Sequence, residues 1–242
     1  AIHRTLRPRK ERPHVRRVLT DMRVIIAFAA LAAFAGSAAA QSPETIMDRA
    51  VSNYASMKTM RAEFRQTITN PLTGSTSVSR GEILRRQPNL LAINFIDPSG
   101  DRVVADGKAV WVYLPSSTPG QVLRLTSGSK AAGSLDPGAL FLTSPRARYT
   151  IKAAGTGVVG GVKTSIIALT PKASNAPFAQ AKVWVDATTG ATKQFEVTDA
   201  NGLTRLVVIT KVTANAPIAR SAFSFTPPRG TRVLDSAGFG GM

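Results

Sequence analysis

The sequence predicts a mainly β (α+β) fold, in which one large antiparallel sheet curves into an open or partial barrel. From Met60 onward, apolar and polar residues alternate with a period of two, as in strands that have one wet face. Short turns separate about eleven such runs, and Asp106-Gly107 and Asn201-Gly202 are strong hairpin signals. No long helical pattern alternates with these runs, which disfavours a parallel α/β sheet.

Residues 43–57 predict the first element, an amphipathic helix. Ser42 is a good N-cap, Pro43 suits the first helical position, and Glu44 lies in the first turn. Apolar residues recur at helical spacing and form one stripe, which we expect to pack on the sheet. A helix on a membrane surface is the alternative, but the charge on its polar face is only scattered. The stripe contains Ile46, Met47, Ala50, Val51, Tyr54 and Met57.

The predicted strands follow this helix, with one interruption. Residues 133–144 lose the two-residue period and predict a short helix that carries Leu135, Leu140, Phe141 and Leu142. The helices are short for covering the inner face of so large a sheet, which favours a cavity beneath an incomplete lid. The strands are expected at 60–68, 75–86, 90–96, 102–106, 108–114, 121–125, 147–154, 162–170, 181–186, 191–197 and 203–212.

The stretch RRQPNLLAINF, residues 85–95, departs from the pattern of one apolar face. Its strand places apolar side chains on both faces, while two arginines and a proline stand at its entrance. Either one face packs in the fold and the other lines a cavity, or this is an ordinary central strand that is buried on both sides. The pattern leaves both readings open.

The first forty residues are unlike the rest and predict an export signal. MRVIIAFAALAAFAGSAAAQ starts at Met22 with a short basic region and continues with an apolar run. It ends in Ala38-Ala39-Ala40, an A-x-A cleavage signal, and is too short for a membrane anchor. We expect residues 22–40 to be a signal peptide, residues 1–21 an upstream extension from a mis-assigned start or an extended basic region, and residues 41–242 a single periplasmic domain.

Composition narrows the possible chemistry. The chain has 31 Lys+Arg, 14 Asp+Glu, two His and no Cys, for a formal net charge of +17. Both histidines, His3 and His14, precede the predicted cleavage site, so the exported part would have neither imidazole nor thiol. We therefore expect no enzyme, although a carboxylate mechanism is the alternative, and we expect no cofactor and no metal.

The positive charge is dispersed and aromatic residues are few, which disfavours a nucleic acid partner. An exported basic surface would instead meet anionic lipid head groups or an acidic partner protein. Scattered solubilising charge explains the same composition equally well.

Several phrases, read in their order along the chain, resemble the LolA family of periplasmic outer-membrane lipoprotein carriers. They are FRQT at 64–67, QPNLLAINF at 87–95, VADGKAVWVYLP at 104–115, LTPKAS at 169–174 and FSFTPPRGTRVLD at 223–235. The resemblance implies an open half-barrel of eleven strands lidded by short helices. It also implies an apolar cavity that takes the acyl chains of a lipoprotein, without a cofactor or covalent chemistry.

The resemblance further implies the partners of a monomeric carrier. An inner-membrane ABC transporter would release the lipoproteins destined for the outer membrane, and an outer-membrane acceptor or the membrane itself would receive them. Two alternatives keep the fold but change the role: a carrier of glycolipid or another lipid, and a sensor domain for envelope stress.

The resemblance also indicates a site. In the family, an arginine directly before the Pro-Asn of this strand holds the lid shut by hydrogen bonds to the lid backbone. Here Gln87 occupies that position, and alternation points Arg86 to the opposite face, so either a bulge restores Arg86 or Gln87 makes a weaker clasp. The expected cavity residues are Phe64, Leu90, Ile93, Phe95, Trp111 and Tyr113, and the expected lid and lid-contact residues are Arg86, Gln87, Leu140 and Phe141.

Overall fold

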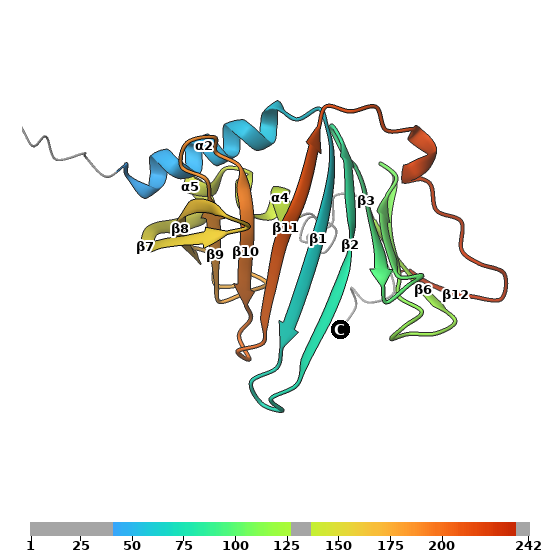
Figure 1. The fold of residues 1–242 in the computed structure, drawn as a ribbon. Coiled ribbons are helices and arrows are strands. Elements are labelled where there is room, and N and C mark those ends of the chain that lie inside the picture. The colour runs from blue at the N-terminus through green and yellow to red at the C-terminus, as the bar shows by residue number, and fades with distance from the viewer. Residues whose placement is uncertain (1–40, 127–136, 236–242) are drawn as a thin grey trace, which may run out of the picture. The chain divides into compact units, whose positions relative to one another are not determined.

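The computed structural model describes residues 41–126 and 137–235, and this part of the chain is mainly β (Figure 1). Its strands form one sheet of twelve strands in the order β12-β6-β5-β4-β3-β2-β1-β11-β10-β9-β8-β7. Because β12 and β7 lie at opposite ends of this order, the sheet is open, as predicted. The predicted signal peptide, the segment before it and Leu135 lie outside the described residues.

Ten of the strand pairs in this part of the chain are antiparallel, and only β12 and β6 run parallel. All eleven strands expected from alternation are present, and β12 is one more than predicted. The bounds are β1 (Thr59–Thr69), β2 (Thr76–Arg86), β3 (Leu90–Asp97), β4 (Arg102–Ala105), β5 (Ala109–Tyr113), β6 (Gln121–Thr126), β7 (Tyr149–Val159), β8 (Val162–Pro171), β9 (Gln180–Val185), β10 (Thr192–Thr198), β11 (Thr204–Ala214) and β12 (Arg232–Asp235).

The two hairpin signals of the sequence are confirmed. At the turn between β4 and β5, Gly107 has a φ of 92°, and the Asp106 carboxylate accepts a hydrogen bond from the backbone of Lys108 at 2.7 Å. At the turn between β10 and β11, Gly202 has a φ of 83°. Both positions need the left-handed backbone that glycine adopts without steric cost.

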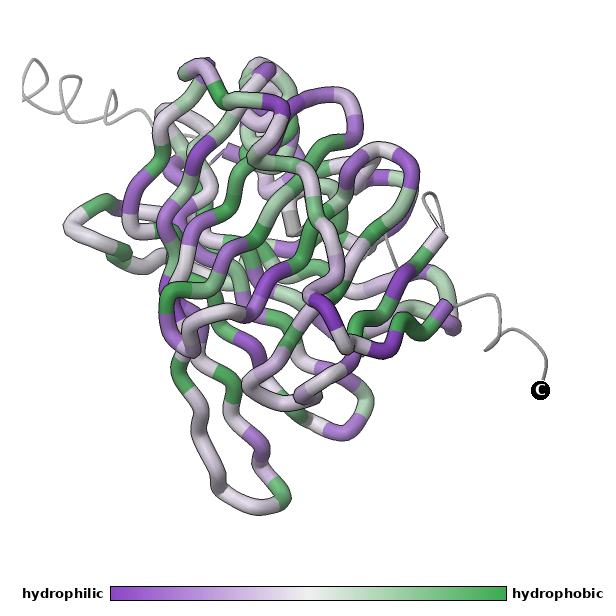
Figure 2. Tube along the Cα trace, turned by 90° about the vertical axis from the view of Figure 1, so that its right-hand side faces the viewer, coloured by the Kyte–Doolittle hydropathy of each residue, from purple (hydrophilic) through white to green (hydrophobic). Residues whose placement is uncertain are grey.

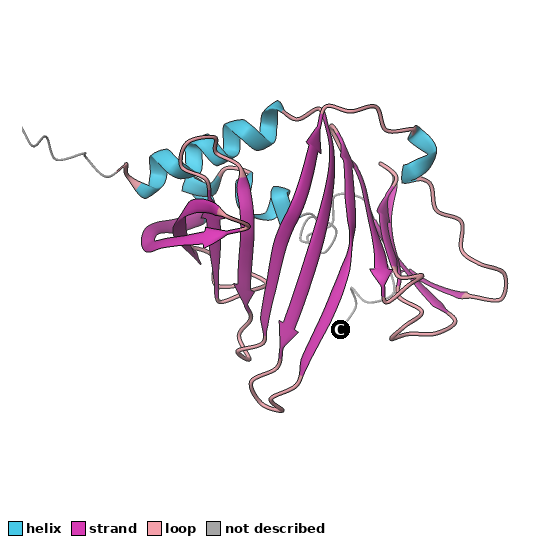
Figure 3. Ribbon diagram, viewed as in Figure 1, coloured by secondary structure: helices cyan, strands magenta, loops and turns pink. Residues whose placement is uncertain are grey.

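Three of the helices in the described residues lie on the side of β7 to β11, and the fourth lies apart from them beside β3 (Figure 3). They are α2 (Pro43–Ser56), α4 (Pro137–Leu142), α5 (Pro145–Arg148) and the 3₁₀ helix η2 (Arg220–Phe223). The Ser42 side chain caps α2 by accepting a hydrogen bond from the Thr45 amide at 3.2 Å, as the sequence predicts. None of the helices described is long and apolar enough to cross a membrane.

The sheet has two separate apolar cores, one on each face. On the inner face, which α2 and α4 cover, Phe64, Ile93 and the buried residues of both helices form one cluster. On the outer face, Leu90 belongs to a second cluster with Ile218 and Phe223 from the C-terminal segment. Figure 2 shows the resulting alternation of apolar and polar residues along the strands.

These two cores explain the double apolar pattern of β3. Leu91 and Ile93 belong to the inner cluster, with Phe95 packed against it, whereas Leu90 and Ala92 belong to the outer cluster. β3 is therefore buried on both faces over its first residues. The C-terminal segment that contains η2 supplies the outer cover.

Candidate functional site

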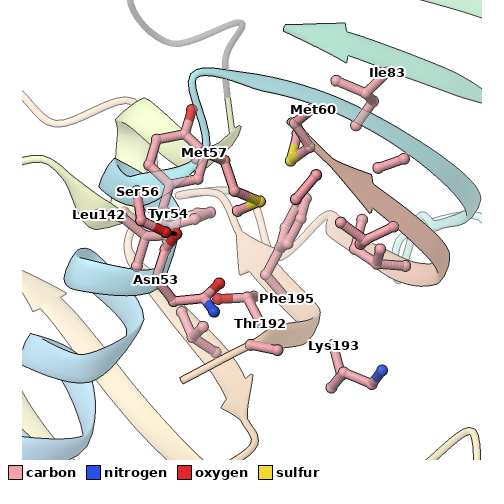
Figure 4. Close-up of a pocket in the computed structure, with 18 of the residues that line it drawn as sticks. Asn53, Tyr54, Ser56, Met57, Met60, Ile83, Leu142, Thr192, Lys193 and Phe195 are labelled. Carbon is pink, nitrogen blue, oxygen red and sulfur yellow. Dashed lines mark hydrogen bonds between the residues drawn. The ribbon is translucent and has the colours of Figure 1, made fainter. Parts of the chain in front are cut away.

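A cavity of about 360 Å³ lies between α2, α4 and the inner face of β1, β10 and β11 (Figure 4). Its volume falls within the range of roughly 300–1,000 Å³ that is typical of ligand sites. In Figure 4, Met57, Met60 and Phe195 point into the same space. The apolar lining is Tyr54, Met57, Met60, Ala62, Ile83, Phe141, Leu142, Val183, Ala191, Phe195, Ile209, Val212 and Ala214.

Two side chains of the RRQ segment fasten the C-terminal end of α2 over this cavity. Arg85 Nη2 donates to the carbonyl oxygens of Tyr54 at 3.0 Å and Met57 at 2.5 Å, and its guanidinium lies 3.8 Å from the centroid of the Tyr54 ring. Gln87 Nε2 donates to the carbonyl oxygens of Ala55 at 2.9 Å and Met57 at 3.2 Å. These donors satisfy the last carbonyls of the helix, and a cation there also suits the helix dipole.

The opposite side of α2 is fastened to the turn between β9 and β10. Arg49 Nη1 donates to the carbonyl oxygen of Ala187 at 2.5 Å, and Asn53 Nδ2 donates to that of Thr189 at 3.2 Å. A Cβ at Gly190 would meet the backbone of Arg49, so this turn can lie so close to α2 only because glycine stands there. α2 is thus held from two sides by side chains rather than by an extended hydrogen-bonded ladder.

An ion pair links α2 to α5. Arg146 donates to the two carboxylate oxygens of Asp48 at 3.1 and 2.6 Å, a bidentate arrangement. The hydrogen bond from Arg146 is the main reason why the pKa of Asp48 lies below its usual value. Both side chains are more than half exposed, so water and salt screen this pair.

Beneath α2, α4 contributes aromatic and backbone contacts. The Phe141 ring lies 5.8 Å from that of Phe178 and 5.6 Å from that of Phe195, by ring centroids. The Tyr149 hydroxyl donates to the carbonyl oxygen of Leu140 at 2.6 Å, and burial raises the pKa of this hydroxyl. These contacts anchor α4 on the inner face of the sheet.

The structure brings five of the ten predicted site residues to the inner core. Phe64 and Phe95 form an edge-to-face pair with centroids 5.6 Å apart, and Ile93 belongs to the same core. Leu140 and Phe141 are buried in it as well, and Phe141 also lines the cavity. Phe64, Ile93 and Phe95 pack in this core but are not among the cavity-lining residues.

Three of the predicted cavity residues lie on the outer face instead. Leu90 packs in the outer cluster, and the rings of Trp111 and Tyr113 lie 5.9 and 5.8 Å from that of Phe225. Alternation along β3 and β5 points all three away from α2, and the C-terminal segment covers them. The structure therefore does not join them to the cavity.

The lid contact involves one predicted residue and one that sequence reasoning missed. Gln87 reaches α2, whereas Arg86 is exposed and borders a shallow outer groove with Lys58 and Asn215. The missed residue is Arg85, which is only 8% exposed. Alternation could have found it, since Arg85 and Gln87 are two residues apart and share a face.

Nothing in the described residues offers a metal centre, because no three His, Cys, Asp or Glu side chains gather closely enough to hold an ion. The acidic groups with lowered pKa serve local structure. Those of Asp106 and Asp186, for example, accept hydrogen bonds within their own turns. The lining of the cavity is instead mostly apolar.

Comparisons with known proteins show which family this chain is similar to. Residues 55–226 match the family model described as outer membrane lipoprotein carrier protein LolA. A protein named outer-membrane lipoprotein carrier protein from Dechloromonas aromatica is 27% identical over 179 residues, which cover 73% of this chain and 81% of the relative. One of the same name from Cupriavidus necator is 29% identical over 216 residues, 87% of this chain and 97% of the relative.

A solved structure shows a similar fold. An uncharacterized conserved protein from Thermus thermophilus superposes with a TM-score of 0.52 at 13% identity, covering 81% of this chain and 99% of that protein. This likeness concerns the fold alone. Because the family model matches well over half of the sequence, the chain belongs to the LolA family of outer membrane lipoprotein carriers.

Proposed function

We propose that this protein carries lipoproteins across the periplasm and shields their acyl chains in the cavity beneath α2 and α4. The observation that carries the proposal is an apolar cavity of about 360 Å³ whose roof is a helix held mainly by side-chain contacts. Membership of the LolA family and the names of the curated relatives support the same role.

The physical need for such a carrier follows from the hydrophobic effect. Exposing a methylene group to water costs about 0.8 kcal/mol, so one long acyl chain costs on the order of 10 kcal/mol. An acylated protein cannot cross an aqueous compartment unaided at a useful rate. A carrier must cover the chains and also release them, which a roof fastened by a few side chains allows.

The proposed cycle begins at an inner-membrane ABC transporter, which releases the lipoprotein and supplies the energy for loading. It ends at an outer-membrane acceptor or at the membrane itself. Displacement of α2 and α4 would extend the cavity along the inner face towards Phe64, Ile93 and Phe95. The protein performs no covalent chemistry in this cycle and needs no cofactor.

Depletion of the protein followed by membrane fractionation tests the role in the cell. We expect outer-membrane lipoproteins to accumulate in the inner membrane. Normal sorting after depletion would contradict the proposal. A bound glycolipid without lipoprotein, found by native mass spectrometry of the protein from periplasm, would favour a lipid carrier instead.

Binding of a diacylated lipopeptide by the purified protein tests the cavity itself. Ile209 lines the cavity, and its neighbour Val208 lies on the other face of β11, opposite Arg65. Ile209→Glu would place a charge among apolar side chains and should weaken binding at least about tenfold. Val208→Glu is the matched control and should leave binding unchanged; equal effects would place the acyl site elsewhere.

A further inference from the structure

The sheet is split between β10 and β11 beside the cavity. β10 and β11 are paired only over the part next to the turn that joins them. The last pair away from this turn is Gln194 opposite Val208. Beyond this pair β11 runs on to Ala214, whereas β10 starts at Thr192. Over the last residues of β11, the side that faces β10 therefore has no strand partner among the described residues.

The cavity extends into this split. A β-bulge in β11 places Ile209 opposite Phe64 but Lys211 opposite Glu63, so that Thr210 is the extra residue. Ile209 thus faces the inner core, while Lys211 lies on the outer side beside Glu63. Both nevertheless line the cavity. Residues from both faces of β11 therefore line the cavity along the edge of this strand that has no partner, and the split lies at the side of the cavity.

Two lysines line the cavity at this split. Lys193 is the extra residue of a second bulge, between β9 and β10, and it lines the cavity with Lys211. In Figure 4, Lys193 lies at the edge of the labelled side chains, with Thr192 nearer their centre. The Thr192 hydroxyl is buried and has no hydrogen-bond partner in the described structure.

The acidic groups nearby leave these cations available. Lys211 Nζ lies 3.6 Å from the Glu63 carboxylate, and both side chains are more than half exposed, so the pair is weak. The charge of Lys193 contributes to lowering the pKa of Asp186, but Lys193 forms no ion pair with Asp186 or another carboxylate among the described residues. A buried hydroxyl and two lysines at the mouth of an apolar cavity match a ligand with an apolar tail and an anionic head.

We propose that the split between β10 and β11 is a portal for a single-chain anionic amphiphile. Its acyl chain lies in the cavity, and its carboxylate or phosphate lies between Lys193 and Lys211, within reach of the Thr192 hydroxyl. The proposal rests on the acyl-binding function proposed above and adds the class of head group. Ion pairs to the head group would favour anionic over neutral amphiphiles of equal chain length.

Fluorescence titration with 11-(dansylamino)undecanoic acid and with its neutral methyl ester tests the portal. We expect the acid to bind about tenfold more tightly than the ester, since each exposed ion pair contributes a factor of less than about five. Lys193→Gln combined with Lys211→Gln should weaken binding of the acid to the level of the ester and leave the ester unchanged. Lys182→Gln is the control, because Lys182 pairs with Glu196 at 3.1 Å away from the cavity.

A second pair of probes identifies the source of the head group. Lysophosphatidylglycerol that binds more tightly than lysophosphatidylcholine, in a way that needs both lysines, assigns the portal to phospholipids. A lysine-dependent preference for the carboxylate probe alone assigns it to fatty acids.

The outcomes also separate this proposal from the carrier function. If acid and ester bind equally well and the double variant binds both like the wild type, the portal is overturned while the acyl cavity stands. If no probe and no diacylated lipopeptide binds the wild-type protein, the acyl cavity fails as well.

Discussion

Replacing Arg85 by methionine should free the C-terminal end of α2 while the sheet stays folded. Methionine keeps an unbranched apolar side chain at this buried position, so the change removes mainly the guanidinium. The Met57 carbonyl keeps a partner in Gln87 Nε2, which lies 3.2 Å away. The loss therefore falls on the attachment of α2 rather than on the core.

The size of the effect follows from the contacts of the guanidinium. A hydrogen bond from a charged donor is worth about 1.5–3 kcal/mol, and a desolvated cation–π contact is worth about 2 kcal/mol. The buried Nε atom of Arg85 has no partner in the described structure, which offsets about 1–3 kcal/mol of this gain. The net loss is about 3 kcal/mol, or roughly 100-fold in the opening equilibrium of this end of α2.

Hydrogen exchange measures this opening directly. Amides of residues 53–57 should exchange about 100-fold faster in Arg85→Met, while amides of the central strands keep their protection. Arg86→Met is the matched control, because Arg86 is exposed and lies on the other face of the strand. Unchanged exchange in Arg85→Met, or equal acceleration in both variants, would refute the assignment of Arg85 as the clasp.

Acidification should loosen α2 where it meets α5. Because the folded-state pKa of Asp48 is lowered by Arg146, this pair stabilises the fold above the usual carboxyl pKa of about 4, and the contribution is lost as pH falls through the lower folded value. Exchange of α2 amides should show this loss in the wild type and not in Asp48→Asn. Gly138→Ala would force its Cβ into a tyrosine ring of α2 and should cost about 1–3 kcal/mol in urea unfolding, whereas Gly157→Ala makes ordinary contacts and should cost less than about 1 kcal/mol. Phe223→Ala should cost about 3–5 kcal/mol if the outer cluster is a true core, and a loss below about 1 kcal/mol would contradict that.

The strands could be predicted from the sequence because alternation is a local signal. Each run of period two became a strand, and the hairpin signals marked their turns. β12 could not be found in this way, since it has four residues and pairs in parallel with β6 far back along the chain. Nothing in its local composition indicates that partner.

The faces of the strands were harder to predict than the strands themselves. The family resemblance led us to expect Trp111 and Tyr113 in the cavity, but the irregular segment around Phe225 covers them on the outer face. The β-bulges could not be predicted from the alternation pattern either. Plain alternation would place Lys211 on the inner face with Ile209, and the register shift at Thr210 reverses it without any local signal.

The C-terminal segment has a consequence for the time at which the protein can fold. β1 lies between β2 and β11, so one of its two edges stays bare until Thr204–Ala214 has been made. The outer cluster and β12 need residues that are synthesised even later. Contacts between such distant parts of a chain form slowly, because a long loop must close first. Synthesis can therefore run nearly to completion before the central strand is paired on both sides.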